Sequence, residues 1–114
     1  MTAGDARFAA LHERLSRSWS VETGRHWLAD NPARGQCGVT ALVVQDLLGG
    51  EILKTAVNGA WHFYNRIDGA LVDFTMDQFA GPIAWDDAPS GREEALADTS
   101  AEQYRLLGDH VGRG

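Results

Sequence analysis

The chain has 114 residues, of which 44% are hydrophobic and 23% charged, a composition typical of a globular domain rather than a disordered chain. Ten Lys and Arg against 16 Asp and Glu give a formal net charge of −6, which argues against a general nucleic-acid-binding protein. The single cysteine excludes an internal disulfide and a CxxC zinc site. We therefore expect a single domain over residues 1–114, with no metal, no other cofactor and no nucleic-acid partner.

The N-terminal segment, residues 1–15, contains Asp5, Arg7, Glu13 and Arg14. Charges at this density are not expected in the apolar part of a signal peptide or in a bilayer span. The sequence therefore predicts a cytoplasmic protein without a membrane partner.

The first half of the chain is predicted to be helical. Apolar residues spaced three and four apart predict a helix over residues 6–17. After a loop, residues 36–48 are apolar almost all round, as in a helix buried in a core. Gly49-Gly50 ends this helix, because glycine adopts the left-handed cap conformation.

Two turn signals divide the middle of the chain into strands. Asn58-Gly59 and Asp68-Gly69 are typical two-residue hairpin turns, since both positions tolerate positive φ. They predict an antiparallel meander with strands over residues 51–57, 60–67 and 70–75.

The C-terminal third reads as irregular over residues 82–92, with a turn of helix over residues 93–97. Ser100 and Gln103 form a capping-box pattern that predicts a terminal helix. The predicted fold class is α+β: N-terminal helices, including the buried helix that carries the cysteine, packed on a small antiparallel meander, with a C-terminal helix.

Cys37 is predicted at the start of the buried helix, where free N–H groups and the helix dipole lower a thiol pKa. Residues 34–36 offer no Ser, Thr, Asp or Asn as a cap, and Gly38 leaves room beside the thiol. We therefore expect the first N–H groups of this helix to be open to an anion. The alternative is that Cys37 is a small buried hydrophobe, the commoner role of a lone cysteine.

The strand register relates His62 to Asp73. A two-residue turn at Asp68-Gly69 makes them diagonal neighbours on one sheet face, with Cα atoms about 7–8 Å apart. A three-residue loop would place them on opposite faces. The alternatives are a structural histidine among aromatic residues and an aspartate at a strand end.

The two faces of the predicted meander differ in polarity. One face carries His62, Tyr64 and Asp73, and the other carries Ile52, Phe63 and Phe74. The second face is more apolar and is expected to meet the core, whereas the catalytic interpretation needs the Cys37 helix on the face that carries His62. We therefore expect both faces to be partly covered, with Trp19, Trp27 or Trp85 contributing.

Cys37, His62 and Asp73 together predict a catalytic triad. The imidazole takes the thiol proton, and the carboxylate fixes the imidazole tautomer. The Cys37 N–H and the Gln36 side chain are candidate donors to an oxyanion, although Gln36 is equally a polar residue at a helix start. These residues predict a cysteine-dependent hydrolase or acyltransferase acting on an amide or ester, with an unknown small-molecule or peptide substrate.

Three short motifs resemble the core of papain-like and transglutaminase-like cysteine enzymes. They are Gly35-Gln36-Cys37 opening an apolar helix, His62 in an aromatic strand, and Asp73-Phe74-Thr75 after a glycine turn. By position, this resemblance implies that fold and a Cys37–His62–Asp73 triad.

A longer pattern resembles the YunG-like family of small uncharacterised bacterial proteins and extends from Trp27 to Phe79. It comprises residues 31–37, 39–46 and 49–53, then His62-x-Tyr64-Asn65-Arg66 and Asp73-x-Thr75-x-x-Gln78-Phe79. The family resemblance implies a fold and no established substrate. Two alternatives to an enzyme remain: a non-catalytic domain of the same fold that binds a small molecule or protein partner, and a structural subunit of a homo-oligomer.

Overall fold

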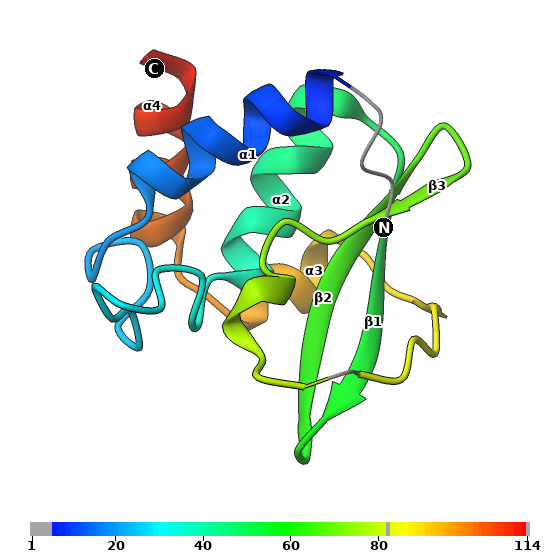
Figure 1. Cartoon of the computed structure of the whole chain (residues 1–114). Helices are drawn as coiled ribbons and strands as arrows, with labels where there is room; N and C mark the ends of the chain where they lie inside the picture. The colour runs from blue at the N-terminus through cyan, green and yellow to red at the C-terminus, as the bar shows by residue number, and fades with distance from the viewer. Residues whose placement is uncertain (1–5, 82, 114) are drawn as a thin grey trace.

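The computed structural model describes residues 6–81 and 83–113, which form four α-helices and a four-stranded antiparallel sheet (Figure 1). The elements in chain order are α1 (Ala6–Ser18), α2 (Cys37–Leu48), β1 (Glu51–Val57), β2 (Ala60–Ile67), β3 (Ala70–Val72), the 3-10 helix η1 (Met76–Gln78), β4 (Ala88–Pro89), α3 (Arg92–Ala97) and α4 (Ala101–Arg113). The predicted α+β class is confirmed. The prediction that residues 1–15 form neither a signal peptide nor a membrane span rests in part on residues 1–5, which lie outside the described range.

The sheet has the strand order β3-β2-β1-β4. Val57 pairs with Ala60 and Ile67 with Ala70, so both hairpins have the predicted two-residue turns. The predicted register is therefore confirmed. Strand β4 was not predicted, because its two residues contribute only a short edge pairing to β1 in a stretch that reads as irregular.

Strand β3 ends at Val72, three residues earlier than the sequence predicts. Oδ1 of Asp73 accepts hydrogen bonds from the Thr75 backbone N–H at 3.0 Å and from the Thr75 hydroxyl at 3.1 Å. Such local side-chain bonds compete with the strand ladder and turn the chain. Consequently β2 extends beyond its neighbour and has an open edge from Phe63 toward the Asn58 turn.

Helix α2 packs on the more apolar face of the sheet, which is opposite the face that carries His62, the face on which the catalytic interpretation needed this helix. Ala41 and Leu42 form one buried cluster with Ile52 and Phe63. On the same face, the Asn65 side chain donates to the Ala41 carbonyl oxygen at 3.2 Å. This packing fixes the start of α2 close to the open edge of β2.

The opposite face is covered by the chain that follows β3. The Phe79 ring meets the His62 ring edge-on, with centroids 4.8 Å apart. Trp85 meets the Tyr64 ring at 4.9 Å and lies 6.4 Å from His62. Both faces are thus covered, with Trp85 on this side, whereas Trp19 lies in the core on the α2 side.

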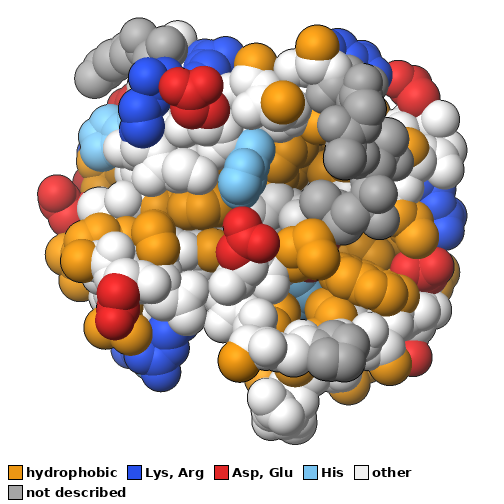
Figure 2. Space-filling model, viewed as in Figure 1, with side chains coloured by type: hydrophobic (Ala, Val, Ile, Leu, Met, Phe, Trp, Pro, Cys, Tyr) orange, Lys and Arg blue, Asp and Glu red, His pale blue; other side chains and the backbone are white. Residues whose placement is uncertain are grey.

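The terminal helices α1 and α4 complete the core beside α2 (Figure 1). Their apolar stripes meet in a cluster that includes Phe8, Leu15, Val39, Leu107 and Val111. No helix within the described residues is long and apolar enough to span a membrane. On the face shown in Figure 2, Lys and Arg side chains lie scattered among acidic ones and form no continuous basic surface there.

The start of α4 confirms half of the predicted capping box. The Gln103 backbone N–H donates to the Ser100 hydroxyl at 3.1 Å. The Gln103 side chain does not reach back to Ser100, because its oxygen accepts from the Thr99 hydroxyl at 2.8 Å. The predicted turn of helix over residues 93–97 is confirmed as α3.

Candidate active site

His62 and Asp73 form a buried pair, each only 2% exposed. His62 Nε2 lies 2.5 Å from Asp73 Oδ2. A carboxylate only accepts hydrogen bonds, so the ring donates its Nε2–H, and in the neutral ring Nδ1 carries the free lone pair. Nδ1 is itself buried and has no hydrogen-bond partner among the described residues. The predicted proximity of this histidine and this aspartate is therefore observed.

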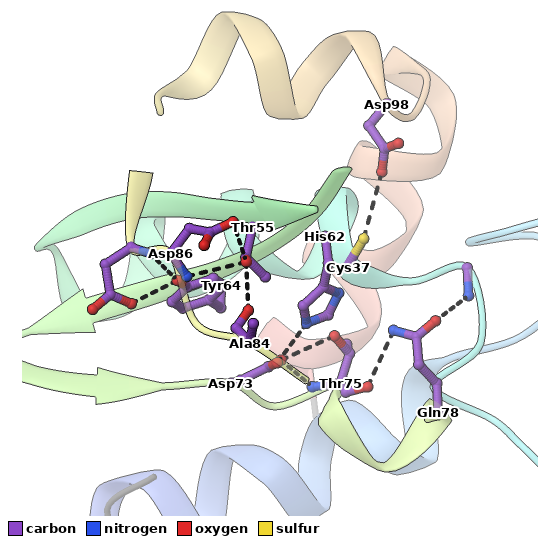
Figure 3. A network of polar contacts seen from close by, with 12 residues as sticks. Cys37, Thr55, His62, Tyr64, Asp73, Thr75, Gln78, Ala84, Asp86 and Asp98 are labelled. Atoms are coloured by element: carbon purple, nitrogen blue, oxygen red, sulfur yellow. Dashed lines mark hydrogen bonds and ion pairs between the residues drawn. The ribbon is translucent and has the colours of Figure 1, made fainter. Parts of the chain in front are cut away.

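Cys37 begins α2, packs against the cluster on the apolar face of the sheet and lies beside the open edge of β2. The β2–β3 ladder ends at the Asn65–Val72 pair, and the next amide facing that side belongs to Phe63. This Phe63 N–H is directed at the Cys37 sulfur. In the view of Figure 3, the His62 ring lies between Cys37 and Asp73. The conflict between the faces is thus resolved by an edge position.

The thiol of Cys37 makes its hydrogen bond to a residue that the sequence analysis missed. Sγ lies 3.8 Å from Oδ2 of Asp98, at the end of α3 (Figure 3). Burial, and then the charge of Asp98, raise the pKa of the Cys37 thiol to about 12, against a smaller opposing effect of the Phe63 amide. The lowered thiol pKa expected from the helix start is therefore wrong, because burial and the carboxylate outweigh the helix N–H groups.

Asp98 also occupies one of the N–H groups that were expected to be open to an anion, that of Gly38. The Gly38 backbone N–H hydrogen-bonds the Asp98 carboxylate and lowers its pKa, although burial has the larger effect and raises it. A Cβ on Gly38 would lie 2.4 Å from Asp98 Oδ2, so this contact requires glycine. The only sequence signal for Asp98 was Gly38 itself, because a glycine can mark a close approach of another group.

Gln36 is fully buried and holds the loop before α2. The Thr23 hydroxyl donates to its Oε1 at 2.8 Å. Its Nε2 donates to the carbonyl oxygens of Ser20 at 3.3 Å and Gly24 at 3.4 Å. The amide is thus directed into the loop, and this geometry gives no support to Gln36 as an oxyanion donor. Its alternative role, a polar residue at the helix start, fits the contacts.

A groove of about 620 Å³ opens at Cys37. Its volume is in the range of small-molecule sites. The walls come from four separate parts of the chain and include Arg25, His26, Trp61, Asp98, Ser100 and Gln103. Sequence reasoning missed this groove because only the tertiary packing of α3 and α4 brings these walls together.

Gln78 joins the Asp73 turn to the entry of α2 (Figure 3). Its side-chain nitrogen donates to the Thr75 carbonyl oxygen at 3.1 Å, and its side-chain oxygen accepts from the Gly35 N–H at 3.3 Å. The Asn31 side chain donates to the Gln78 carbonyl oxygen at 3.2 Å. These contacts hold the loop that carries Cys37 against the segment that carries Asp73.

Two carboxylates hold the segment that covers His62 (Figure 3). The Tyr64 hydroxyl donates to Asp87 at 2.6 Å, and the Thr55 hydroxyl contacts Asp86 at 3.0 Å. Trp85 is thereby held against the His62 face of the sheet. The described residues contain no group of three or more His, Cys, Asp or Glu placed to hold a metal ion.

The comparisons with known proteins identify the family. A model of the YunG protein family matches residues 7–113 of the chain. The chain belongs to this family. It is also 50% identical, over 99 residues, to the uncharacterised protein YunG of Bacillus subtilis strain 168. The aligned region covers 87% of this chain and 86% of the Bacillus protein. No solved structure matches the chain. The resemblance to papain-like and transglutaminase-like enzymes therefore stays a prediction.

Proposed function

We propose that this protein is a cysteine-dependent hydrolase or acyltransferase with a papain-like or transglutaminase-like triad of Cys37, His62 and Asp73. The observation that carries the proposal is the state of His62. Its Nε2 is held by Asp73 at 2.5 Å, and its buried Nδ1 has no partner among the described residues. A fully buried imidazole with one nitrogen oriented and the other unused is suited to take a proton from a neighbouring group.

The proposed reaction passes through a thioester. The Cys37 proton moves to His62 Nδ1, and the sulfur forms a bond to the carbonyl carbon of an amide or ester. The C–N or C–O bond breaks, and the leaving amine or alcohol takes the proton from Nδ1. Water or an acceptor amine then attacks the thioester and transfers its proton through His62, which releases an acid or a new amide and restores the thiol.

Two backbone amides support this chemistry. The N–H groups of Phe63 and Gly38 are both directed at the Cys37 sulfur and lower the pKa of its thiol. Donors at this position stabilise a thiolate, and donors beside the nucleophile stabilise the oxyanion formed from the substrate carbonyl. The groove at Cys37 gives a small acyl compound access to the sulfur.

The experiment is single-turnover acylation with a small activated ester, 4-nitrophenyl acetate. Released nitrophenolate is followed optically, and the acetyl group is located by peptide mass spectrometry. We expect acetylation at Cys37, its loss in Cys37→Ser, and a rate at least about 100-fold lower in His62→Gln, the usual contribution of a general base. Gln retains an N–H for Asp73 but cannot take the thiol proton.

The matched control is His110→Gln, which changes an exposed histidine on α4 and should leave the acylation rate unchanged. Circular dichroism verifies that each variant is folded. Equal acylation rates in the wild-type protein and in folded His62→Gln would contradict the proposal.

Ligand binding without catalysis is the second candidate function. It is favoured by the raised pKa of Cys37, because a thiol with a pKa of about 12 is almost entirely protonated at neutral pH. Acylation that is insensitive to His62→Gln would support this second candidate over the triad.

A further inference from the structure

We propose that Asp98 inhibits Cys37 reversibly, a role for which we use the word guard. The Asp98 carboxylate occupies the site at the start of α2 where the oxyanion of an acyl substrate must bind. The substrate must move Asp98 aside before the thiol can react. This inference rests on the proposed function and names the regulation of the same site.

The contacts of Asp98 carry the first step of the argument. Its Oδ2 accepts from the Cys37 thiol at 3.8 Å, and its carboxylate accepts from the Gly38 backbone N–H. The absence of a side chain on Gly38 is what admits the carboxylate, because a Cβ there would lie 2.4 Å from Oδ2 and 2.8 Å from the Asp98 Cβ. The negative group of the chain thus lies where a substrate oxyanion would need N–H donors.

His62 provides the second, independent observation. Its Nδ1 is buried and lacks a partner among the described residues, although an unpaired buried polar atom is costly. A thiol has one proton and donates it to one acceptor at a time. While Cys37 donates to Asp98, it cannot donate to His62. In the proposal, release of Asp98 lets the thiol turn toward the unpartnered Nδ1 of His62.

The position of Asp98 allows this release. It caps the C-terminal end of the six-residue helix α3, where it is exposed at the junction with α4. A rotation of its side chain would carry the carboxylate into solvent without a change in the core. Ala95 of the same helix is fully buried and anchors α3 during that rotation.

The charged groups around Asp98 come from several elements. Cys37 lies on α2 and His62 on β2, and the charge of His62 lowers the pKa of Asp98. Arg25 and His26 line the same groove from the loop that precedes α2. The experiment must therefore separate the charge of Asp98 from the titration of these neighbours.

The test measures carboxamidomethylation of Cys37 by iodoacetamide as a function of pH. Burial raises the pKa of the Cys37 thiol most, and the Asp98 charge raises it further. Asp98→Asn removes that charge, so we expect the rate at pH 7.5 to rise by about tenfold or more. Gly38→Ala should raise the rate as well, since its Cβ displaces the carboxylate. Glu93→Gln removes a negative charge from an exposed position on the same helix α3 and should leave the rate unchanged.

A double variant, Asp98→Asn with His62→Gln, distinguishes a guard from a purely electrostatic effect. If the thiol donates its hydrogen bond to His62 once Asp98 is released, the gain in alkylation rate from Asp98→Asn should be several-fold smaller in the His62→Gln background. Such coupling is expected of residues in one network. An equal gain in both backgrounds would contradict the change of hydrogen-bond partner from Asp98 to His62. It would show that Asp98 acts on the thiol through its charge alone.

The outcomes also separate this inference from the proposed function. An unchanged or lower alkylation rate in folded Asp98→Asn would overturn the guard, even if ester acylation depends on His62. A raised alkylation rate in Asp98→Asn, together with acylation that does not depend on His62, would support the effect of Asp98 on Cys37 but contradict the triad. Asp98 would then regulate no triad reaction, and the guard would also be overturned.

Discussion

At the scale of the residue, the structure presents Cys37 in a protonated resting state. Burial and the Asp98 charge raise the pKa of the thiol to about 12, from an ordinary value of 9.0. The thiolate, not the thiol, is the nucleophile. Burial, and after it the charge of Asp98, therefore favour the protonated thiol over the thiolate that the proposed reaction needs.

The pH dependence of wild-type alkylation follows from this state. We expect the iodoacetamide rate of Cys37 to keep rising through pH 9 and above, without the plateau that a free thiol reaches near its own pKa. N-acetylcysteine and the urea-unfolded chain provide the reference profiles. A half-maximal rate near pH 9 in the folded protein would contradict the expectation.

The same shift affects stability, and its sign follows from linkage. Because the folded pKa of Cys37 lies above the unfolded one, the folded state retains the proton above pH 9. The contribution of Cys37 to the free energy of unfolding is therefore complete below pH 9 and is lost as the pH rises toward 12.

The sequence predicted the residue pair His62 and Asp73 because strand register follows from turn length alone. It could not predict Asp98. The contact between Asp98 and Cys37 joins residues 61 positions apart, and no local pattern specifies how a short helix such as α3 packs on α2. Likewise, the burial of Gln36 depends on the loop that folds over it, which has no periodic pattern.

At the scale of the element, the early end of β3 creates the site. Asp73 bonds to Thr75 instead of continuing the ladder, and the edge of β2 is left free for Cys37. The sequence predicted both hairpins correctly because Asn-Gly and Asp-Gly specify the turn. It placed the end of β3 too late because the strand propensity of Phe74 and Thr75 was given more weight than Asp73, a residue type depleted from strands. The alternative of an aspartate at the strand end is the one observed.

The junction between α2 and β1 gives a prediction for two adjacent glycines. Gly50 has φ +81°, and a Cβ there would lie 2.2 Å from the Arg66 carbonyl oxygen, whereas Gly49 has φ +73° and nothing within 4 Å. Gly49 combines φ +73° with ψ −152°, a conformation that essentially only glycine adopts, so Gly49→Ala should lower the free energy of unfolding by about 1–3 kcal/mol through backbone strain alone. Gly50→Ala should lower it further, because the backbone of β2 must also move.

Urea unfolding of the two variants measures this difference. A Gly50→Ala variant as stable as Gly49→Ala would show that β2 does not lie against Gly50 as described. The two variants share the substitution and a positive φ, and they differ in the contacts that the new Cβ makes with the backbone of Arg66 and Ile67.

At the scale of the whole molecule, the two ends of the chain close the core over α2. The amphipathic patterns predicted the terminal helices but not their order of packing, because an apolar stripe does not specify its partner. Leu107 on α4 is fully buried in the cluster that contains α1 and α2 residues. The fold that positions Cys37 therefore depends on residues near both termini.

Truncation of this contact should be costly. We expect Leu107→Ala to lower the free energy of unfolding by about 2–5 kcal/mol, as is usual for a buried leucine. Leu96→Ala, on α3, changes a leucine that is 43% exposed and should cost less than about 1 kcal/mol. Urea denaturation followed by circular dichroism compares the two, and similar losses would refute the packing of α4 on the core.

The central claim is that His62, held by Asp73, takes the proton of Cys37. The most direct measurement is the single-turnover rate of Cys37 acetylation by 4-nitrophenyl acetate in wild-type protein and in His62→Gln, with the acetyl group located by peptide mass spectrometry. The account predicts acetylation at Cys37 and a rate at least about 100-fold lower in folded His62→Gln. Equal rates in the two proteins, or acetylation only at other residues, would contradict it.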